Sequence, residues 1–303
     1  MNGNSIFKSR MARREALEGL LFAGPLLLGL LIFTLYPVLD SLYISFTKYN
    51  IFTPPEFIGL QNYRNLVNDS LFWQSLRITT IYSVISVPLQ LVAGFAVALL
   101  MNQKVRGITI FRTIYYLPSV VSGVAVSLLW VWIFNPDYGL ANVMLRAAHL
   151  PTQKWLTDPR TALGSFIFMS LWGIGGGMII YLAGLQGVPQ HLYESASMDG
   201  ANIYQKFRHV TLPMMTPVIF YNLVMGIIGS FQVFTQAFVM TSGGPANATL
   251  FYVLYLFRQA FNYFRMGYAS AMAWVLFAII LALTLLVLKS SSAWVYYEGE
   301  RKR

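Results

Sequence analysis

The chain contains no cysteine and only three histidines, which limits the chemistry open to it. Without cysteine, disulfides, thiol nucleophiles and thiolate metal sites are excluded. His149, His191 and His209 are far apart in the sequence, and no H-E-x-x-H or G-x-S-x-G segment occurs. Metal ligands or a catalytic triad need convergent side chains, so we expect no catalytic residues and no bound metal. A G-x-x-x-x-G-K-[ST] segment is also missing, so we do not expect this chain itself to bind ATP or another cofactor.

Charged residues are also scarce, at 11% of the 303 residues, and they fall between long uncharged tracts. About 20 apolar residues cross the ~30 Å hydrocarbon core of a membrane, so each tract predicts one helix. The fold class that follows is all-α, a polytopic membrane protein with six transmembrane helices. The six tracts are 19–39, 78–103, 113–136, 161–190, 210–257 and 266–288.

The fifth tract is long enough for two helices, but Gly243, Gly244 and Pro245 interrupt it. Non-helical backbone would leave polar groups unpaired in lipid. We therefore predict one helix in this tract, followed by a loop on the outer side of the membrane.

The basic residues predict the orientation of the chain. Lys and Arg concentrate in cytoplasmic segments beside membrane spans, and a cytoplasmic N-terminus places 13 of the 21 basic residues inside. These 13 are Lys8, Arg10, Arg13, Arg14, Lys104, Arg106, Arg112, Lys206, Arg208, Lys289, Arg301, Lys302 and Arg303. The predicted organisation is a cytoplasmic segment 1–18, a transmembrane permease domain 19–290 and a cytoplasmic tail 291–303.

Two other interpretations of the basic residues are disfavoured. A cleaved signal peptide over residues 8–40 would have an apolar part that is too long. The net charge of +10 could indicate nucleic-acid binding, but the basic residues sit beside apolar tracts and form no solvated stripe. Membrane topology therefore explains the charge better.

None of the 11 acidic residues falls in the middle of a predicted span. Proton-coupled and sodium-coupled carriers commonly need an ionisable group at that depth. The sequence therefore disfavours a secondary transporter, and the energy for active transport would have to come from another subunit.

The segment 187–213, between the fourth and fifth tracts, predicts a hairpin of two short helices. Pro189 suits the first turn of a helix, and Gly200 suits a left-handed stop directly after Asp199. The first helix of the hairpin is thereby delimited at both ends.

A second helix is predicted to begin directly after the turn. Asn202 suits the N-cap position, and Gln205 suits its partner in a capping box. This helix is expected to end at about Val210, before Leu212 and Pro213.

The hairpin resembles the E-A-A…D-G-A…F…I…L-P loop of binding-protein-dependent ABC importer permeases. The matching residues are Glu194, Ser195, Ala196, Asp199, Gly200, Ala201, Phe207, Val210, Leu212 and Pro213. The resemblance implies that the hairpin lies on the cytoplasmic surface and docks into a cleft on an ATP-binding subunit, which would hold ATP and Mg²⁺. It assigns ATPase coupling to Glu194, Ser195, Ala196, Asp199, Gly200, Ala201 and Phe207. For Asp199, capping of its own turn is an alternative of equal weight.

A second resemblance concerns two outer segments. Residues 240–249 read M-T-S-G-G-P-A-N-A-T, and residues 57–63 read F-I-G-L-Q-N-Y. They are similar to the T-x-G-G-P…T and F-x-G-L-x-N-Y segments of sugar-family permeases, including the larger maltose-type subunit. The resemblance implies an importer of sugars, oligosaccharides in particular, that works by alternating access in the cytoplasmic membrane of a bacterium or archaeon.

A chain with one set of six spans would be half of such a transporter. The implied partners are a second homologous permease subunit, two ATP-binding subunits, an extracytoplasmic sugar-binding protein and membrane lipid, with no nucleic acid. An importer of another polyol-like solute, such as glycerol phosphate, is the alternative within this class, although its phosphate would favour a basic residue in the cavity. A passive channel is the alternative from another class, and the coupling hairpin argues against it.

Sugars are recognised by planar hydrogen-bonding groups and aromatic faces. An alignment with the maltose-type subunit, anchored on Glu194, supplies candidate sugar contacts, and Asn222 is a polar neighbour on the same helix face. The predicted substrate path is Trp172, Gly173, Gly176, Asn222, Gly226, Gly229 and Ser230. For the glycines, close packing of membrane helices is an alternative. Gln232 and Gln236 are further polar neighbours, of which Gln232 points to another face.

A reporter fused after Arg303 is expected on the cytoplasmic side, and one inserted between Ala246 and Ala248 on the outer side, because one predicted span separates them. Paired alkaline phosphatase and fluorescent-protein fusions measure this directly, since each is active on one side only. Finding both positions on the same side would mean that the spans between them have been miscounted.

Overall fold

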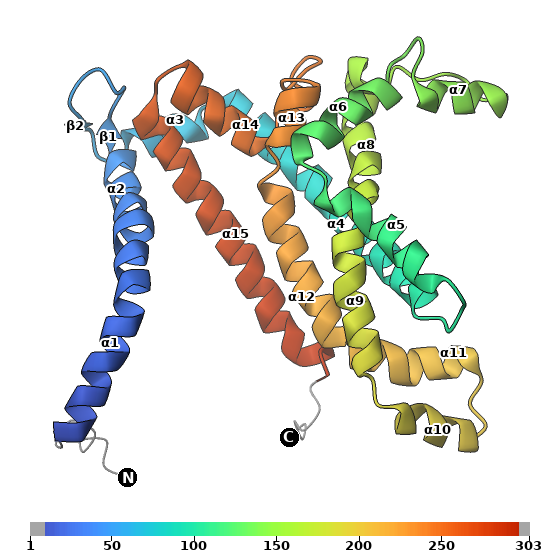
Figure 1. Cartoon of the computed structure of the whole chain (residues 1–303). Coiled ribbons are helices and arrows are strands. Elements are labelled where there is room, and N and C mark those ends of the chain that lie inside the picture. The colour runs from blue at the N-terminus through green and yellow to red at the C-terminus, as the bar shows by residue number, and fades with distance from the viewer. Residues whose placement is uncertain (1–9, 297–303) are drawn as a thin grey trace. The chain divides into compact units, whose positions relative to one another are not determined.

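The computed structural model describes residues 10–296, which fold almost entirely into helices (Figure 1). They form two compact units, residues 10–66 with 259–274 and residues 67–258 with 275–296. The ends of the two predicted cytoplasmic segments lie outside the described residues, and with them Lys8, Arg301, Lys302 and Arg303.

The first unit contains the N-terminal helical run, a short two-stranded ribbon and the start of the last helix. Its elements are α1 (Arg10–Leu30), the π-helical stretch Leu31–Leu35, α2 (Tyr36–Ser45), β1 (Thr47–Lys48), β2 (Glu56–Phe57), α3 (Gln61–Val67) and the first part of α15 (Met266–Trp294). The antiparallel ribbon was not expected from the sequence. Nδ2 of buried Asn62 on α3 donates to the backbone oxygens of Ser45 at 2.9 Å and Thr47 at 2.8 Å, which ties α3 to the end of α2 and to β1.

The second unit contains most of the helices. They are α4 (Ser70–Met101), α5 (Ile108–Val120), α6 (Gly123–Ile133), α7 (Leu140–Ala147), α8 (Pro159–Ser170), α9 (Gly175–Gly187), α10 (Gln190–Met198), α11 (Ile203–Lys206), α12 (Leu212–Phe231), α13 (Thr235–Met240) and α14 (Tyr252–Phe257). Shorter turns occupy Trp155–Thr157, Leu171–Gly173 and Phe207–Thr211. The π-helical stretch Arg258–Asn262 falls at the boundary, with all but Arg258 in the first unit. Helices α4, α9 and α12 lie side by side, with α10 and α11 at one end and α6 and α13 at the other (Figure 1).

The core of this unit forms where α4, α9 and α12 meet, near the end that leads to α10. Met178, Tyr181 and Met215 are almost completely buried there. Gly184 permits the close approach, because a Cβ at this position would lie 2.7 Å from Cγ2 of Val218. Small residues let membrane helices pack at short distance, so steric fit fixes how the three helices lie against one another.

By length and composition, four helical runs could cross a membrane, or up to six if each of two bent helix pairs counts as one span. The four runs are Arg14–Ser45, Ser70–Met101, Ile203–Met240 and Met266–Trp294. They correspond to the first, second, fifth and sixth predicted tracts, and the bent pairs correspond to the third and fourth. The structure agrees with an all-α polytopic membrane protein, and the count of six spans stays a prediction.

The prediction of one helix over 113–136 is wrong, because the chain bends by 99° between α5 and α6. Val121 is extended, with ψ at 140°, and the hydroxyl of Ser122 caps α6 by accepting a hydrogen bond from the N–H of Ala125 at 3.3 Å. Pro118 has no N–H to donate. The proline and the cap together favour a break over a continuous helix.

The predicted helix over 161–190 is also divided. The chain bends by 44° between the 3₁₀ turn Leu171–Gly173 and α9. A Cβ on Gly175 would collide with the backbone oxygen of Tyr115. Glycine is therefore needed where α9 begins against α5.

The second helix of the hairpin does not end near Val210, as the sequence predicted. Helix runs without interruption from Ile203 to Phe231, through the π-helical stretch Phe207–Thr211. Pro213 lies in the first turn of α12 and does not break the run. A π-helical stretch shifts the backbone hydrogen-bond pattern and so accommodates a residue without an N–H.

The interruption predicted at Gly243 is confirmed. Gly243 has a left-handed backbone with φ at 82°, which suits a residue without a Cβ. Thr249 Oγ1 donates to the backbone oxygen of Gly244 at 2.6 Å and shares a 2.7 Å hydrogen bond with the hydroxyl of Thr241. These side chains replace the backbone partners that the helix loses at this loop.

Candidate functional site

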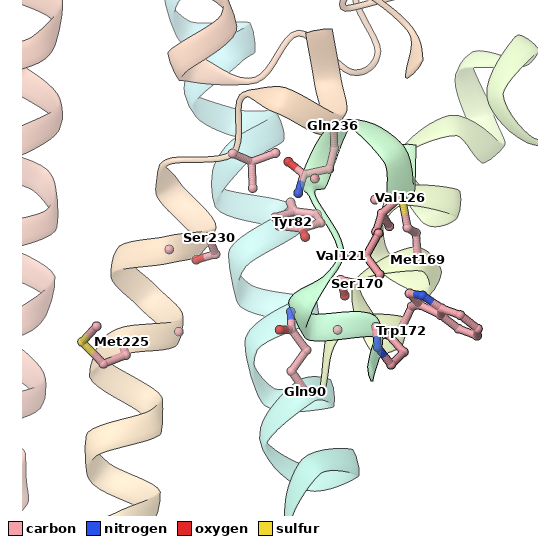
Figure 2. Close-up of a pocket in the computed structure, with 16 residues that line it drawn as sticks. Tyr82, Gln90, Val121, Val126, Met169, Ser170, Trp172, Met225, Ser230 and Gln236 are labelled. Atoms are coloured by element: carbon pink, nitrogen blue, oxygen red, sulfur yellow. The ribbon is translucent and has the colours of Figure 1, made fainter. Parts of the chain in front are cut away.

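A cavity of about 390 Å³ opens between α4, α12, α13 and the two bent helix pairs (Figure 2). Gln236 and Tyr82 lie at one end of it and Gln90 at the other (Figure 2). The lining residues are Tyr82, Gln90, Pro118, Val121, Gly123, Val126, Met169, Ser170, Trp172, Gly173, Met225, Gly226, Gly229, Ser230, Val233 and Gln236.

The cavity lies where three helices are interrupted. Pro118 and Val121 belong to the break between α5 and α6, Trp172 and Gly173 to the break between α8 and α9. Val233 lies between α12 and α13. At each break the paired helical backbone stops, and the chain turns side chains and backbone toward the same space.

The lining is polar but uncharged. Among the described residues, no Asp, Glu, Lys or Arg lines the cavity, and no group of three or more His, Asp or Glu could hold a metal ion. The amides of Gln90 and Gln236 and the hydroxyls of Tyr82 and Ser170 share the lining with the indole of Trp172, which is 45% exposed. Amides, hydroxyls and an accessible aromatic face suit a ligand that carries many hydroxyl groups.

Most of the predicted substrate-path residues come together here. Asn222 lies outside the large cavity and lines a smaller one of about 160 Å³ that shares part of its wall. Gly176 lines neither cavity, and a Cβ there would lie 3.9 Å from Cβ of Ser119. The five that line the large cavity are Trp172, Gly173, Gly226, Gly229 and Ser230. Their contact with a substrate stays a prediction.

The structure separates two glycines that the sequence could not distinguish. A Cβ on Gly226 would lie 3.1 Å from Cγ1 of Val87, so this glycine brings α12 close to α4. A Cβ on Gly229 would meet no atom within 4 Å, so this glycine leaves open space in the cavity. The lack of a side chain at Gly226 allows close helix packing, and the lack of one at Gly229 leaves volume in the cavity.

Ser230 connects the cavity wall to α4. It is buried, and its hydroxyl shares a 2.6 Å hydrogen bond with the hydroxyl of Ser83 and donates to the backbone oxygen of Ile227 at 2.9 Å. A serine with these partners holds two helices together as well as lining the cavity.

Sequence reasoning missed the contribution of α4, because the predicted path lay on the fourth and fifth spans only, and Gln90 and Tyr82 on α4 line the cavity. Within the fourth span it also left out Ser170, at the end of α8. Gln90 carried a usable signal, because it is the one amide side chain between Val84 and Met101. An amide in an apolar span commonly faces the inside of a helix bundle.

The second candidate site is the hairpin of α10 and α11. The N–H of Ala201 donates to the oxygen of Ala196 at 2.9 Å, and the N–H of Gly200 donates to the oxygen of Ser197 at 3.1 Å. With φ at 78° for Gly200, these bonds form a Schellman motif. The left-handed stop predicted at Gly200 is confirmed.

The start of α11 has the predicted capping box. Asn202 Oδ1 accepts from the N–H of Gln205 at 2.9 Å, and Gln205 Oε1 accepts from the N–H of Asn202 at 2.8 Å. The turn therefore satisfies its own backbone groups. Among the described residues, none donates a hydrogen bond to the carboxylate of Asp199, so the turn does not depend on it.

The predicted coupling residues do not share one surface of the hairpin. A hollow of about 310 Å³ contains Ala196, Asp199, Gly200 and Ala201. Glu194 and Ser195 are exposed on α10, and Gln190 Nε2 donates to Glu194 Oε1 at 2.9 Å. Phe207 is turned inward, with its ring 6.2 Å from that of Phe95 on α4.

The exposed side of the hairpin also carries large apolar side chains. Met198 and Ile203 are each 87% exposed, and Tyr204 is exposed beside them. Exposed apolar side chains gathered at one turn are typical of a surface that another protein covers.

Comparisons with known proteins place the chain among transporter components. Residues 90–296 match the family described as binding-protein-dependent transport system inner membrane component. The chain is 44% identical over 310 residues to the probable ABC transporter permease protein YesP of Bacillus subtilis, covering 100% of each. It is 34% identical over 286 residues to the trehalose/maltose transport system permease protein MalF of Thermococcus litoralis, covering 93% of this chain and 96% of that protein.

The structure is also similar to a solved one. It matches a chain of a bacterial ABC transporter involved in the import of the acidic polysaccharide alginate, with a TM-score of 0.82 and 25% sequence identity. The match covers 94% of this chain and 99% of that chain.

Replacing Ser83 or Ser230 by alanine is expected to destabilise the protein by about 1 kcal/mol, because each change removes the same buried hydrogen bond. The double variant should therefore lose little more than either single variant. Thermal unfolding in detergent measures the three values, and Ser119→Ala, on the exposed end of α5, is the control. Losses that add fully would show that the two hydroxyls act independently.

Proposed function

Because the chain belongs to the family of binding-protein-dependent transport system inner membrane components, we propose that it is the transmembrane permease subunit of an ATP-binding-cassette importer for sugars, in particular oligosaccharides. As a multi-pass membrane protein, it would sit in a bacterial or archaeal cytoplasmic membrane with both termini in the cytoplasm. Its partners would be a second homologous permease, two ATP-binding subunits and an extracytoplasmic sugar-binding protein.

One observation carries this proposal. The helix that begins at the hairpin with Ile203 continues without a break to Phe231, and Gly229 and Ser230 in its last turns line the cavity. A continuous helix transmits displacement along its length because its backbone hydrogen bonds resist bending. A force applied to the hairpin would therefore reach the cavity wall directly.

This connection suggests how alternating access works. The partner ATPases would bind ATP with Mg²⁺, close on each other and draw the two hairpins together. The α11–α12 helix would then tilt against α4 and turn the cavity outward to receive a sugar from the binding protein. Hydrolysis by the partners would reverse the movement, and this chain would supply the path and the linkage.

The cavity lining supports a sugar as substrate. Two amides, several hydroxyls and the exposed indole of Trp172 match the hydroxyl-rich, partly apolar faces of sugar rings. The names of the relatives, trehalose/maltose for one and alginate for another, point to the same class. For a glycerol phosphate importer we would expect a Lys or Arg in the lining, and among the described residues none is there. A passive channel would have no need of the hairpin surface.

Co-purification tests the proposal. The tagged chain, extracted in mild detergent, should bring with it an ATP-binding subunit and a second permease, identified by mass spectrometry. The associated binding protein is then screened against a panel of oligosaccharides. Recovery of the chain with neither partner, or conductance in liposomes without nucleotide, would contradict the proposal.

Gly200→Val is expected to abolish transport and substrate-stimulated ATP hydrolysis. A Cβ at this position meets no atom within 4 Å, but the left-handed backbone destabilises a valine by roughly 1–2 kcal/mol. We therefore expect the turn between α10 and α11 to be distorted. Gly187→Val, also in open space but without a positive φ, is the control. Glu194→Lys should give a similar loss by reversing an exposed charge. Stimulation at the wild-type level in either variant would refute the role of that residue.

Gly229→Leu is expected to reduce sugar uptake roughly tenfold or more, since a Cβ at 229 meets no atom within 4 Å and the larger side chain would take up cavity volume. Assembly and basal ATP hydrolysis should persist. Gly164→Leu on α8 is the matched control, because it also meets no atom within 4 Å and does not line the cavity. Unchanged uptake over all sugar concentrations would place the path elsewhere.

A further inference from the structure

The smaller cavity, of about 160 Å³, lies next to the large one. Gln90, Gly173, Met225 and Gly226 line both. The two cavities are therefore adjacent along α4 and α12.

The smaller cavity is displaced toward the hairpin. Its lining extends from Gly173, which lies just before α9 and lines both cavities, to Tyr181 on α9, which is closer to α10. Along α12, it moves from Ser230 in the large cavity to Asn222 in the small one, two turns closer to α11. The linings of the two cavities thus follow one another from the end near α13 toward the end near α10.

Three polar groups in the smaller cavity have hydrogen-bonding capacity left over. Tyr181 is 1% exposed, and its hydroxyl has no hydrogen-bond partner within residues 10–296. Gln90 forms no hydrogen bond with any other described residue. Asn222 donates from Nδ2 to the oxygen of Val218 at 2.9 Å, which leaves its Oδ1 as an acceptor.

Local packing holds one of these groups in place. A Cβ on Gly177 would lie 3.3 Å from Oδ1 of Asn222, so the absence of a side chain at 177 lets this oxygen approach α9. Gly177 and Tyr181 are four residues apart on α9 and so lie on one face of that helix, and Gly173 lies in the turn directly before it. The glycines open the cavity, and the tyrosine closes its end.

The end of the cavity is firmly packed. The ring of Tyr181 lies against α4, with Cε2 3.5 Å from the place of a Cβ on Gly94 and the ring centroid 5.4 Å from that of Phe95. A buried hydroxyl without a partner costs free energy. Its presence among apolar side chains is explained if another state of the protein supplies the partner.

We propose that the smaller cavity is a second station on the substrate path, where Gln90, Asn222 and Tyr181 form hydrogen bonds with sugar hydroxyls after the sugar leaves the large cavity on its way to the cytoplasm. The inference rests on the proposed function for the identity of the substrate. The existence of a polar path through these three residues can be tested without it.

Cysteine accessibility tests the path, because the chain has no cysteine of its own. Gln90→Cys, Asn222→Cys and the control Val92→Cys are made in the complete transporter, and each is exposed to the thiol reagent MTSET, a charged, membrane-impermeant methanethiosulfonate. Val92 is also on α4 but on the opposite face, where its side chain is 70% exposed in this chain. In the predicted membrane span, lipid would cover this face and keep water from the thiol. Modification of this chain is followed by intact mass, without nucleotide and after trapping with vanadate and ATP.

Both path cysteines are expected to react at least about tenfold faster than Val92→Cys in one of the two states, because a thiol needs water to form the reactive thiolate. Reaction of Asn222→Cys no faster than Val92→Cys in both states would overturn the proposal. Fast reaction in a transporter that imports no sugar would contradict the proposed function and leave the polar path standing.

Tyr181→Phe separates a role in the path from a role in packing. The ring and its contacts remain, so the melting temperature of the complex should stay the same or rise. Uptake of the oligosaccharide that the binding protein retains in the screen should fall about tenfold, as expected for one lost hydrogen bond in a buried site. Unchanged uptake, or a lower melting temperature with a proportional loss of uptake, would remove Tyr181 from the path.

Discussion

The need to pair every backbone N–H and C=O in apolar surroundings controls this structure. A helix meets that need by itself, so the apolar tracts are helical wherever the chain allows. At the few places where a tract is not helical, side-chain hydroxyls take the place of the missing backbone partners. The hydroxyl of Ser122 caps the start of α6, and the hydroxyls of Thr241 and Thr249 bond within the loop after α13. Three of the interruptions meet around the large cavity, where the chain has stopped pairing its backbone as a helix does. The same constraint therefore explains both the helices and the place of the site.

Local features of the hairpin could be predicted from the sequence because they depend on neighbouring residues only. The left-handed Gly200 and the capping box of Asn202 with Gln205 are found as predicted. The bend at Val121 and the continuous helix past Pro213 could not be predicted. A membrane helix can continue straight through a proline, kink at it or end near it, and the outcome depends on what packs around the proline. Hydrophobic tracts give the number of candidate spans. They do not say which of them is straight.

The candidate path shows a similar limit. Resemblance placed five residues in one cavity, because a related fold puts equivalent helix positions in equivalent places. It could not assign Gly226 to helix packing and Gly229 to open volume, since that difference depends on whether Val87 of α4 stands opposite. It also missed Gln90, although a lone amide in an apolar span commonly faces the inside of a helix bundle. Which helices Gln90 faces could be identified only from the structure.

The exposed side chains at the hairpin turn have a consequence for the life of the subunit in the cell. Met198 and Ile203 are each 87% exposed, and with the proposed orientation they lie in the cytoplasm until an ATP-binding subunit covers them. Chaperones and quality-control proteases bind such apolar surfaces. If an ATP-binding subunit covers this surface as proposed, a copy of the chain that lacks that partner would expose it to quality control.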